Sequence, residues 1–127
     1  MRALITSLIV LILLASCWFV FHQYSDTRLR EIVSVCEEEV MPAIESEHWG
    51  QAEARFQAQY QAWHIYKKRA LLMLETDRLT DLDFAFAKTL MYIKAKDVSN
   101  SSGELLALQE ALKRLYENEE LSLANIL

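Results

Sequence analysis

The sequence predicts an all-α protein, in which an N-terminal transmembrane helix (1–24) is followed by a small antiparallel three- or four-helix bundle (25–127). Three observations support this prediction. The run from Ala3 to Phe21 is apolar and carries no charge. Apolar residues recur every three or four positions through most of the remaining chain, as on a helix face. The 127 residues include only 2 Gly and 1 Pro, too few for a sandwich or barrel with a turn every 8 to 12 residues or so.

Composition also excludes several classes of function. The net charge of −5 disfavours a nucleic-acid binder. Gly50 and Gly103 stand alone, so the chain has no Gly-rich phosphate loop. Two cysteines cannot form a disulfide framework or a four-cysteine zinc site.

The first element is the apolar run. Ala3 to Phe21 holds 19 residues, which span roughly 28 Å at about 1.5 Å per residue, close to the ~30 Å hydrocarbon core of a bilayer. Trp18, Phe19, Phe21 and Tyr24 cluster at its C-terminal end, where an aromatic belt belongs. An uncleaved single-pass anchor is therefore the favoured interpretation.

Two other interpretations of this run stay open. Ala15, Ser16 and Cys17 are small enough for signal-peptide cleavage, although the apolar run continues to Phe21. The residues 14–17 also resemble a lipoprotein box, in which Cys17 would be acylated.

Flanking charge does not decide the orientation of an anchor, because Arg2 precedes the run and Arg28 and Arg30 follow it. The very short N-terminal flank favours export of the C-terminal part. We therefore expect a cell-membrane protein with its helical domain outside the cytoplasm.

The next two helices are defined by their stripes. The first is expected over Leu29 to Ile44, with Pro42 ending or kinking it. The second is expected from about residue 48 to 74, with Trp49, Phe56, Tyr60 and Trp63 on one face. This aromatic stripe is typical of a bundle core, and the alternative is the lining of a cavity for an apolar ligand. The basic run 67–69 predicts a solvated face, and otherwise a site for lipid headgroups.

The last two helices follow a turn and a loop. Asp77 to Asp81 is interpreted as a turn and cap before a third helix, which carries Leu79, Leu82, Phe86, Leu90 and Ile93 on one face. The range 97–103 has the composition of a loop. The fourth helix is expected over about 104–119, with Leu105, Leu108, Leu112 and Leu115 in the spacing of a coiled-coil seam.

The C-terminus is unusually apolar for a chain end, since residues 121–127 contain four large aliphatic side chains. Such a tail docks either on its own bundle or on a partner or membrane surface. The candidate partner-binding residues are Leu121, Leu123, Asn125, Ile126 and Leu127.

Residues that could carry chemistry do not form a recognisable constellation. His48 and His64 are sixteen residues apart, about 24 Å along a helix, and cannot share a metal within one chain. Cys36 lies on an apolar stripe, where a buried free thiol is the usual state. We predict no catalytic residues, no cofactor and no metal site.

Several segments together resemble one known family. They are Trp49–Ala52, Trp63, Leu79–Asp83, Tyr92–Asp97 and Tyr116–Leu127. The chain resembles the bacterial, membrane-anchored family catalogued as domain of unknown function 4363, whose members are small helical proteins without an assigned activity. The family's pattern implies an Asp at His48, His at Thr76 and Arg114, and Glu at Arg78, so this chain departs from it at all four positions.

These observations predict an uncharacterised single-pass membrane protein that serves as a non-enzymatic interaction or accessory module at the membrane surface. The expected partners are the lipid bilayer and a membrane protein, without nucleic acid. The alternatives are a binding protein for a small apolar or lipid ligand, and a lipoprotein anchored through Cys17.

Overall fold

The computed structural model describes the backbone of residues 1–70 and 76–126, and the side chains at 22, 25, 26, 76 and 118–126 lie outside the described residues. Every element in the described ranges is helical. The elements are α1 (Arg2–Val35), the π-helical turn η1 (Cys36–Val40), α2 (Met41–Glu45), α3 (Trp49–Ala70), α4 (Thr76–Lys94) and α5 (Val98–Ile126). The predicted all-α fold is confirmed.

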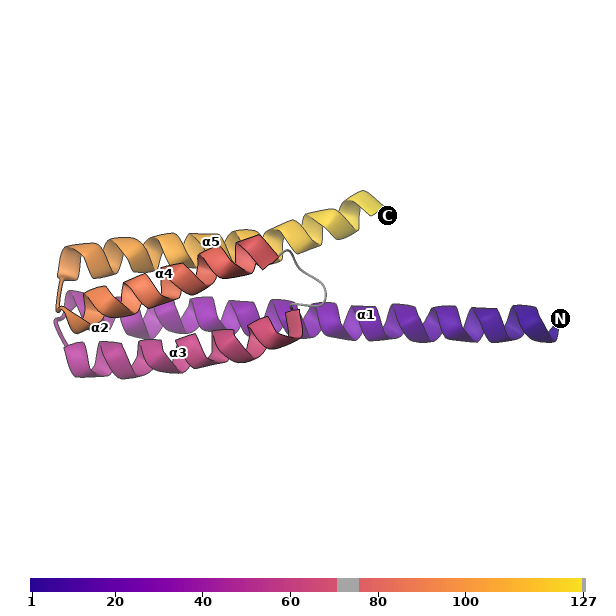
Figure 1. The fold of residues 1–127 in the computed structure, drawn as a ribbon, viewed down its shortest axis with the longest axis horizontal. Helices are drawn as coiled ribbons and strands as arrows, with labels where there is room; N and C mark the ends of the chain where they lie inside the picture. Colours follow the sequence, from indigo (N-terminus) through magenta and orange to yellow (C-terminus); the bar gives the residue numbers. More distant parts are fainter. Residues whose placement is uncertain (71–75, 127) are drawn as a thin grey trace.

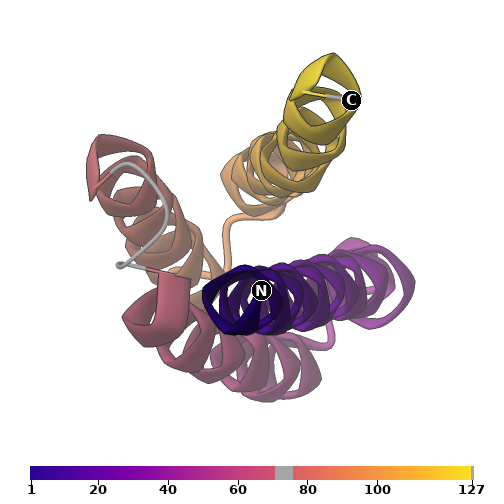
Figure 2. The same ribbon diagram turned by 90° about the vertical axis from the view of Figure 1, so that its right-hand side faces the viewer.

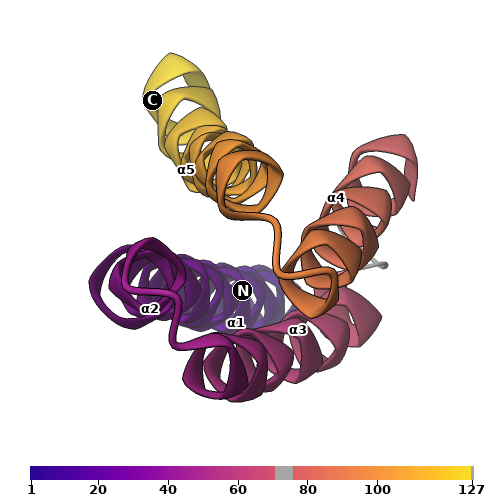
Figure 3. The same cartoon turned by 90° about the vertical axis from the view of Figure 1, so that its left-hand side faces the viewer.

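The helices run alternately up and down around one core (Figure 1). The helix α1 contacts α3 and α5, and α4 contacts the same two helices, so the four long helices form a closed ring. The connections from α2 to α3 and from α4 to α5 lie at one end of the bundle (Figure 3). The N-terminal part of α1 projects from the other end (Figure 1).

We call the projecting segment Arg2–Phe21 the stem, and the end of the bundle from which it projects the stem end. The stem is a helical segment of 20 residues and is the one part of the described chain long and apolar enough to cross a membrane. None of it is buried. A core helix of a globular domain would instead be covered by its neighbours.

The stem and the first bundle helix are parts of one continuous helix rather than separate elements. The stripe Leu29, Val33, Cys36, Val40 and Ile44 is buried as its spacing predicts. Pro42 does not end the helix, because the backbone passes through η1 into α2. In η1 the Met41 N–H bonds the Cys36 carbonyl, five residues back. This wider turn falls where the proline ring would otherwise clash with the carbonyl of Glu38.

The core is built from the predicted stripes. Phe86 of α4 lies at its centre, with ring centroids 5.7 Å from Phe56, 5.3 Å from Tyr60 and 5.5 Å from Trp63, all on α3. The fully or nearly fully buried leucines of α4 and α5 complete it: Leu79, Leu82, Leu105, Leu108, Leu112 and Leu115. Rings at these separations contribute packing beyond the apolar area that they bury.

Ion pairs join the acidic turn η1 to two neighbouring helices. The Nζ of Lys113 on α5 lies 2.6 Å from Oε1 of Glu37. The Nη1 of Arg55 on α3 lies 3.7 Å from Oε1 of Glu39. Both contacts are partly exposed, so they orient η1 more than they stabilise it.

Candidate functional site

The structure places the predicted aromatic stripe within and beside the core. Phe56 and Trp63 have no exposed surface, and Trp49 and Tyr60 are half-buried and packed against the core. Tyr60 also stacks on His64, with ring centroids 4.6 Å apart.

The predicted partner-binding tail continues α5 rather than folding back as a separate segment. The helix runs to Ile126, and its last turns extend beyond α3 and α4 on the side of the stem (Figure 1). The side chains of Leu121, Leu123, Asn125 and Ile126, and the whole of Leu127, lie outside the described residues.

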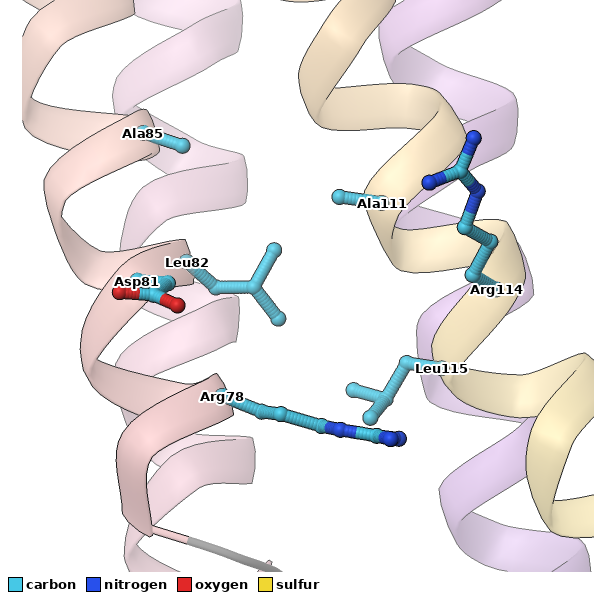
Figure 4. A pocket seen from close by; sticks show the side chains of 7 residues that line it. All are labelled: Arg78, Asp81, Leu82, Ala85, Ala111, Arg114 and Leu115. Carbon is cyan, nitrogen blue, oxygen red and sulfur yellow. The ribbon is translucent and has the colours of Figure 1, made fainter.

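A groove with a volume of about 330 Å³ lies between α4 and α5. Its lining comes from Arg78, Asp81, Leu82 and Ala85 on α4, and from Ala111, Arg114 and Leu115 on α5. Leu82 and Leu115 point into the space between the helices, and Arg78 reaches across it from α4 toward α5 (Figure 4). We call this recess the α4–α5 groove.

The groove results from small side chains and from the divergence of two helices. Ala85 and Ala111 lack the side-chain volume that would fill the gap between the two helices. The helices α4 and α5 also separate toward the stem end (Figure 2). The result is a mainly apolar recess whose lining also includes two arginines and the carboxylate of Asp81, and a mainly apolar lining with a few polar groups is typical of small-molecule sites.

The ionisable groups Asp83 and Cys36, outside the groove, take part in packing and in hydrogen bonds within the fold. Asp83 of α4 accepts hydrogen bonds from Trp63 and Lys67 of α3. Burial raises the pKa of the Cys36 thiol to about 12, with a smaller contribution from the nearby Glu37 carboxylate. Within the described part of the chain, no group of three or more His, Cys, Asp or Glu residues is placed to hold a metal ion.

The bundle matches a known protein family. A family model described as "Domain of unknown function (DUF4363)" matches residues 22–126. The chain belongs to this family. The DUF4363 match begins directly after the stem and covers the whole bundle. Neither the curated proteins nor the solved structures include a match.

Sequence reasoning missed the α4–α5 groove. Its lining residues lie on two helices more than twenty-five residues apart, and alanines on a helix are ordinarily read as packing residues. The sequence did single out Arg78 and Arg114, as two positions at which the resemblance implies other residues. The structure brings these two positions into one recess.

Proposed function

We propose that this chain is a single-pass membrane protein whose helical bundle serves as a non-enzymatic interaction or accessory module at the membrane surface. The observation that carries this proposal is the stem, which is apolar, unburied and helical over 20 residues. A surface of that size exposed to water would be a strong liability for a soluble protein. Its length matches the hydrocarbon core of a bilayer.

The continuity of α1 supports a fixed position of the bundle on the membrane. The stem leads into Leu29 and Ile32, which are buried in the core, within the same helix. The bundle would therefore stand directly on its anchor, with the stem end facing the lipid. The last turns of α5 extend in the same direction (Figure 1), which would bring the apolar tail near the membrane surface.

The state of the N-terminus is tested by the intact mass of the protein extracted from cell membranes. An uncleaved anchor gives the full mass of 14.8 kDa. A lipoprotein gives a chain that begins at Cys17 and carries acyl groups, and Cys17→Ser abolishes its processing. A cleaved, unlipidated chain recovered from the soluble fraction would overturn the membrane proposal.

The orientation that we propose places the bundle outside the cytoplasm of a bacterial cell. A cysteine introduced at Ser99, which is exposed at the end of the bundle away from the stem, tests it in a Cys17→Ser background. A membrane-impermeant thiol reagent should label this cysteine in intact cells. Labelling only after cell disruption would place the bundle in the cytoplasm.

The interaction role is tested by crosslinking and capture from native membranes. The full chain is compared with a chain lacking residues 121–127 and with a full-length Leu121→Ser, Leu123→Ser variant. A specific membrane protein captured by the full chain, and lost with both variants, supports an accessory role with recognition in the tail. Equal capture by all three moves the interface to the bundle or the stem. Absence of any specific partner contradicts the proposal.

A second candidate function is the binding of a small amphiphile, and the α4–α5 groove favours it. Native mass spectrometry of the purified protein should then detect a co-purified ligand. Ala111→Phe fills the groove, whereas Ala107→Phe makes the same change at an exposed position on the same helix. Loss of ligand with the first variant alone supports this function, and no ligand on the wild type excludes it.

A further inference from the structure

Two guanidinium groups converge on the ring of Tyr24, just beyond the stem. The Cζ of Arg28 lies 5.3 Å from the ring centroid of Tyr24, and the Cζ of Arg69 lies 5.2 Å from it. The Nη1 of Arg69 also donates a hydrogen bond of 2.7 Å to the Tyr24 hydroxyl. Arg28 comes from α1 and Arg69 from the last turn of α3. We call these three residues the Tyr24 cradle.

Among the residues that the structure describes, the N–H donors of the cradle are only partly used, which leaves capacity for an anion. Each guanidinium carries five N–H donors, and Arg69 uses one of them on the Tyr24 hydroxyl. Glu31 lies 3.5 Å from Arg28, but both side chains are more than half exposed, so this pair is weak. A cavity of about 240 Å³ between α1 and α3 includes all three cradle residues and Glu31.

An apolar surface continues from the cradle toward the stem. A second, shallower recess is lined by Cys17, Val20 and Phe21 of the stem. It shares Tyr24 and Arg69 with the cavity between α1 and α3. Tyr24 is three residues beyond Phe21, which is about 4.5 Å along a helix. A molecule occupying both recesses would have its apolar part along the stem and its polar part between the arginines.

We propose that the Tyr24 cradle binds the phosphate headgroup of an anionic phospholipid, whose acyl chain lies along Val20 and Phe21. This inference rests on the proposed membrane anchoring through the stem. Arginine suits the site because its planar fork pairs two N–H groups with two phosphate oxygens. The cradle lies at the boundary where such headgroups are found, and cationic pockets beside transmembrane helices are suited to them. Two arginines held on one ring repel each other, and a bound anion relieves that repulsion.

The bound lipid would fix the bundle relative to the membrane. Arg28 lies on α1 just beyond the stem and Arg69 lies on α3, so a lipid with its headgroup between them and its acyl chain along Val20 and Phe21 would contact both α3 and the stem. The stem would then be prevented from rotating or tilting independently of α3.

The test uses the full chain reconstituted in vesicles of phosphatidylcholine, with and without phosphatidylglycerol. Lipids retained on the protein are counted by native mass spectrometry after gentle release. The test variant is Arg28→Gln, Arg69→Gln. The control is Arg30→Gln, Lys68→Gln, which removes the same charge from neighbouring positions on the same two helices. It leaves the cradle intact but removes the contact of Arg30 with the Tyr116 ring of α5, so the fold of both variants is compared by circular dichroism.

We expect the wild type to retain phosphatidylglycerol in preference to phosphatidylcholine. The cradle variant should lose this preference by roughly tenfold or more, whereas the control should change by less than about threefold. Tyr24→Phe should weaken retention less than the double arginine variant, because it keeps the ring and removes only the hydroxyl.

Three results would overturn the inference. They are no preference in the wild type, an equal loss in both double variants, and complete displacement by excess soluble glycerophosphate, which would assign the site to a free phosphate. Failure of the membrane proposal is a separate outcome, because the chain would then wash off phosphatidylcholine vesicles at alkaline pH. Retention on those vesicles without a preference for phosphatidylglycerol contradicts the cradle alone.

Discussion

The indole Nε1 of Trp63 on α3 donates a hydrogen bond of 2.7 Å to Oδ1 of Asp83 on α4. The other carboxylate oxygen of Asp83 accepts from Nζ of Lys67, one turn further along α3. Trp63 is fully buried, and the side chains of Lys67 and Asp83 are about one-quarter exposed. One carboxylate therefore satisfies the only polar atom of a core tryptophan side chain and a cation at the edge of the same core.

Asp83→Ala should destabilise the fold by about 2 kcal/mol, because it leaves the buried indole N–H without its acceptor and removes a charge-assisted hydrogen bond. Asp83→Asn should cost less, because the amide oxygen can still accept from Trp63. Asp81→Ala is the control, since Asp81 is exposed on the same helix. Thermal unfolding of the full chain in detergent, followed by circular dichroism, measures all three. Equal effects of the changes at 81 and 83 would contradict the structural role of Asp83.

Cys36 gives the fold a specific dependence on alkaline pH. Burial, aided by Glu37, raises the pKa of this thiol from 9.0 to about 12 in the folded protein. Below pH 9 the thiol is protonated in both states and the pH has no effect through this group. Between pH 9 and 12 the unfolded chain loses the proton while the folded protein keeps it, so stability falls as pH rises.

Cys36→Ala should therefore reduce the loss of stability between pH 9 and 12 relative to the wild type, even though the substitution lowers stability at neutral pH. The pKa values of Lys88 and Lys113 are raised by Glu104 and Glu37, and both lysines are present in both proteins. The comparison between the two proteins isolates the thiol. Parallel pH profiles would show that Cys36 is not buried as described.

Periodicity predicted the fold because each helix buries only one face. The stripes of α1, α4 and α5 could be recognised from the sequence, because apolar residues three and four positions apart form one face of a helix. The groove between α4 and α5 could not be predicted in this way. It depends on the divergence of two helices (Figure 2), and that angle is set by side chains on both of them rather than by the pattern on either.

The start of α5 was predicted wrongly for a local reason. The composition of 97–103 is that of a loop, yet α5 begins at Val98. Asp97 caps it, with Oδ1 accepting from the Asn100 N–H at 3.1 Å and Oδ2 accepting from the Asn100 side chain at 2.7 Å. Serine and asparagine side chains favour loops because they hydrogen-bond to the nearby backbone. Here Asp97 accepts from a free N–H group of the first helical turn, and this cap allows the helix to begin before the serines.

Gly103 is consequently inside a helix, and Gly103→Ala should stabilise the protein by about 1 kcal/mol. Its φ is not positive, and a Cβ at this position would meet no atom within 4 Å beyond its own turn of helix. Gly50→Ala, also in open space but at the second residue of α3, should gain less because the end of a helix is less ordered. Unfolding midpoints of both variants test this, and a lower midpoint for Gly103→Ala would contradict the helical start of α5.

Gln109 offers the opposite case, a polar side chain inside the core. It is 3% exposed, and within the described residues its Nε2 has no hydrogen-bond partner. A buried amide N–H donor without an acceptor carries the full cost of its desolvation. Gln109→Met keeps the length of the side chain and removes the unsatisfied donor, so the free energy of unfolding should rise by about 1 kcal/mol. Gln57→Met, at an exposed position of α3, should leave it nearly unchanged. A clear loss of stability with Gln109→Met would show that the amide makes a bond on which the fold depends.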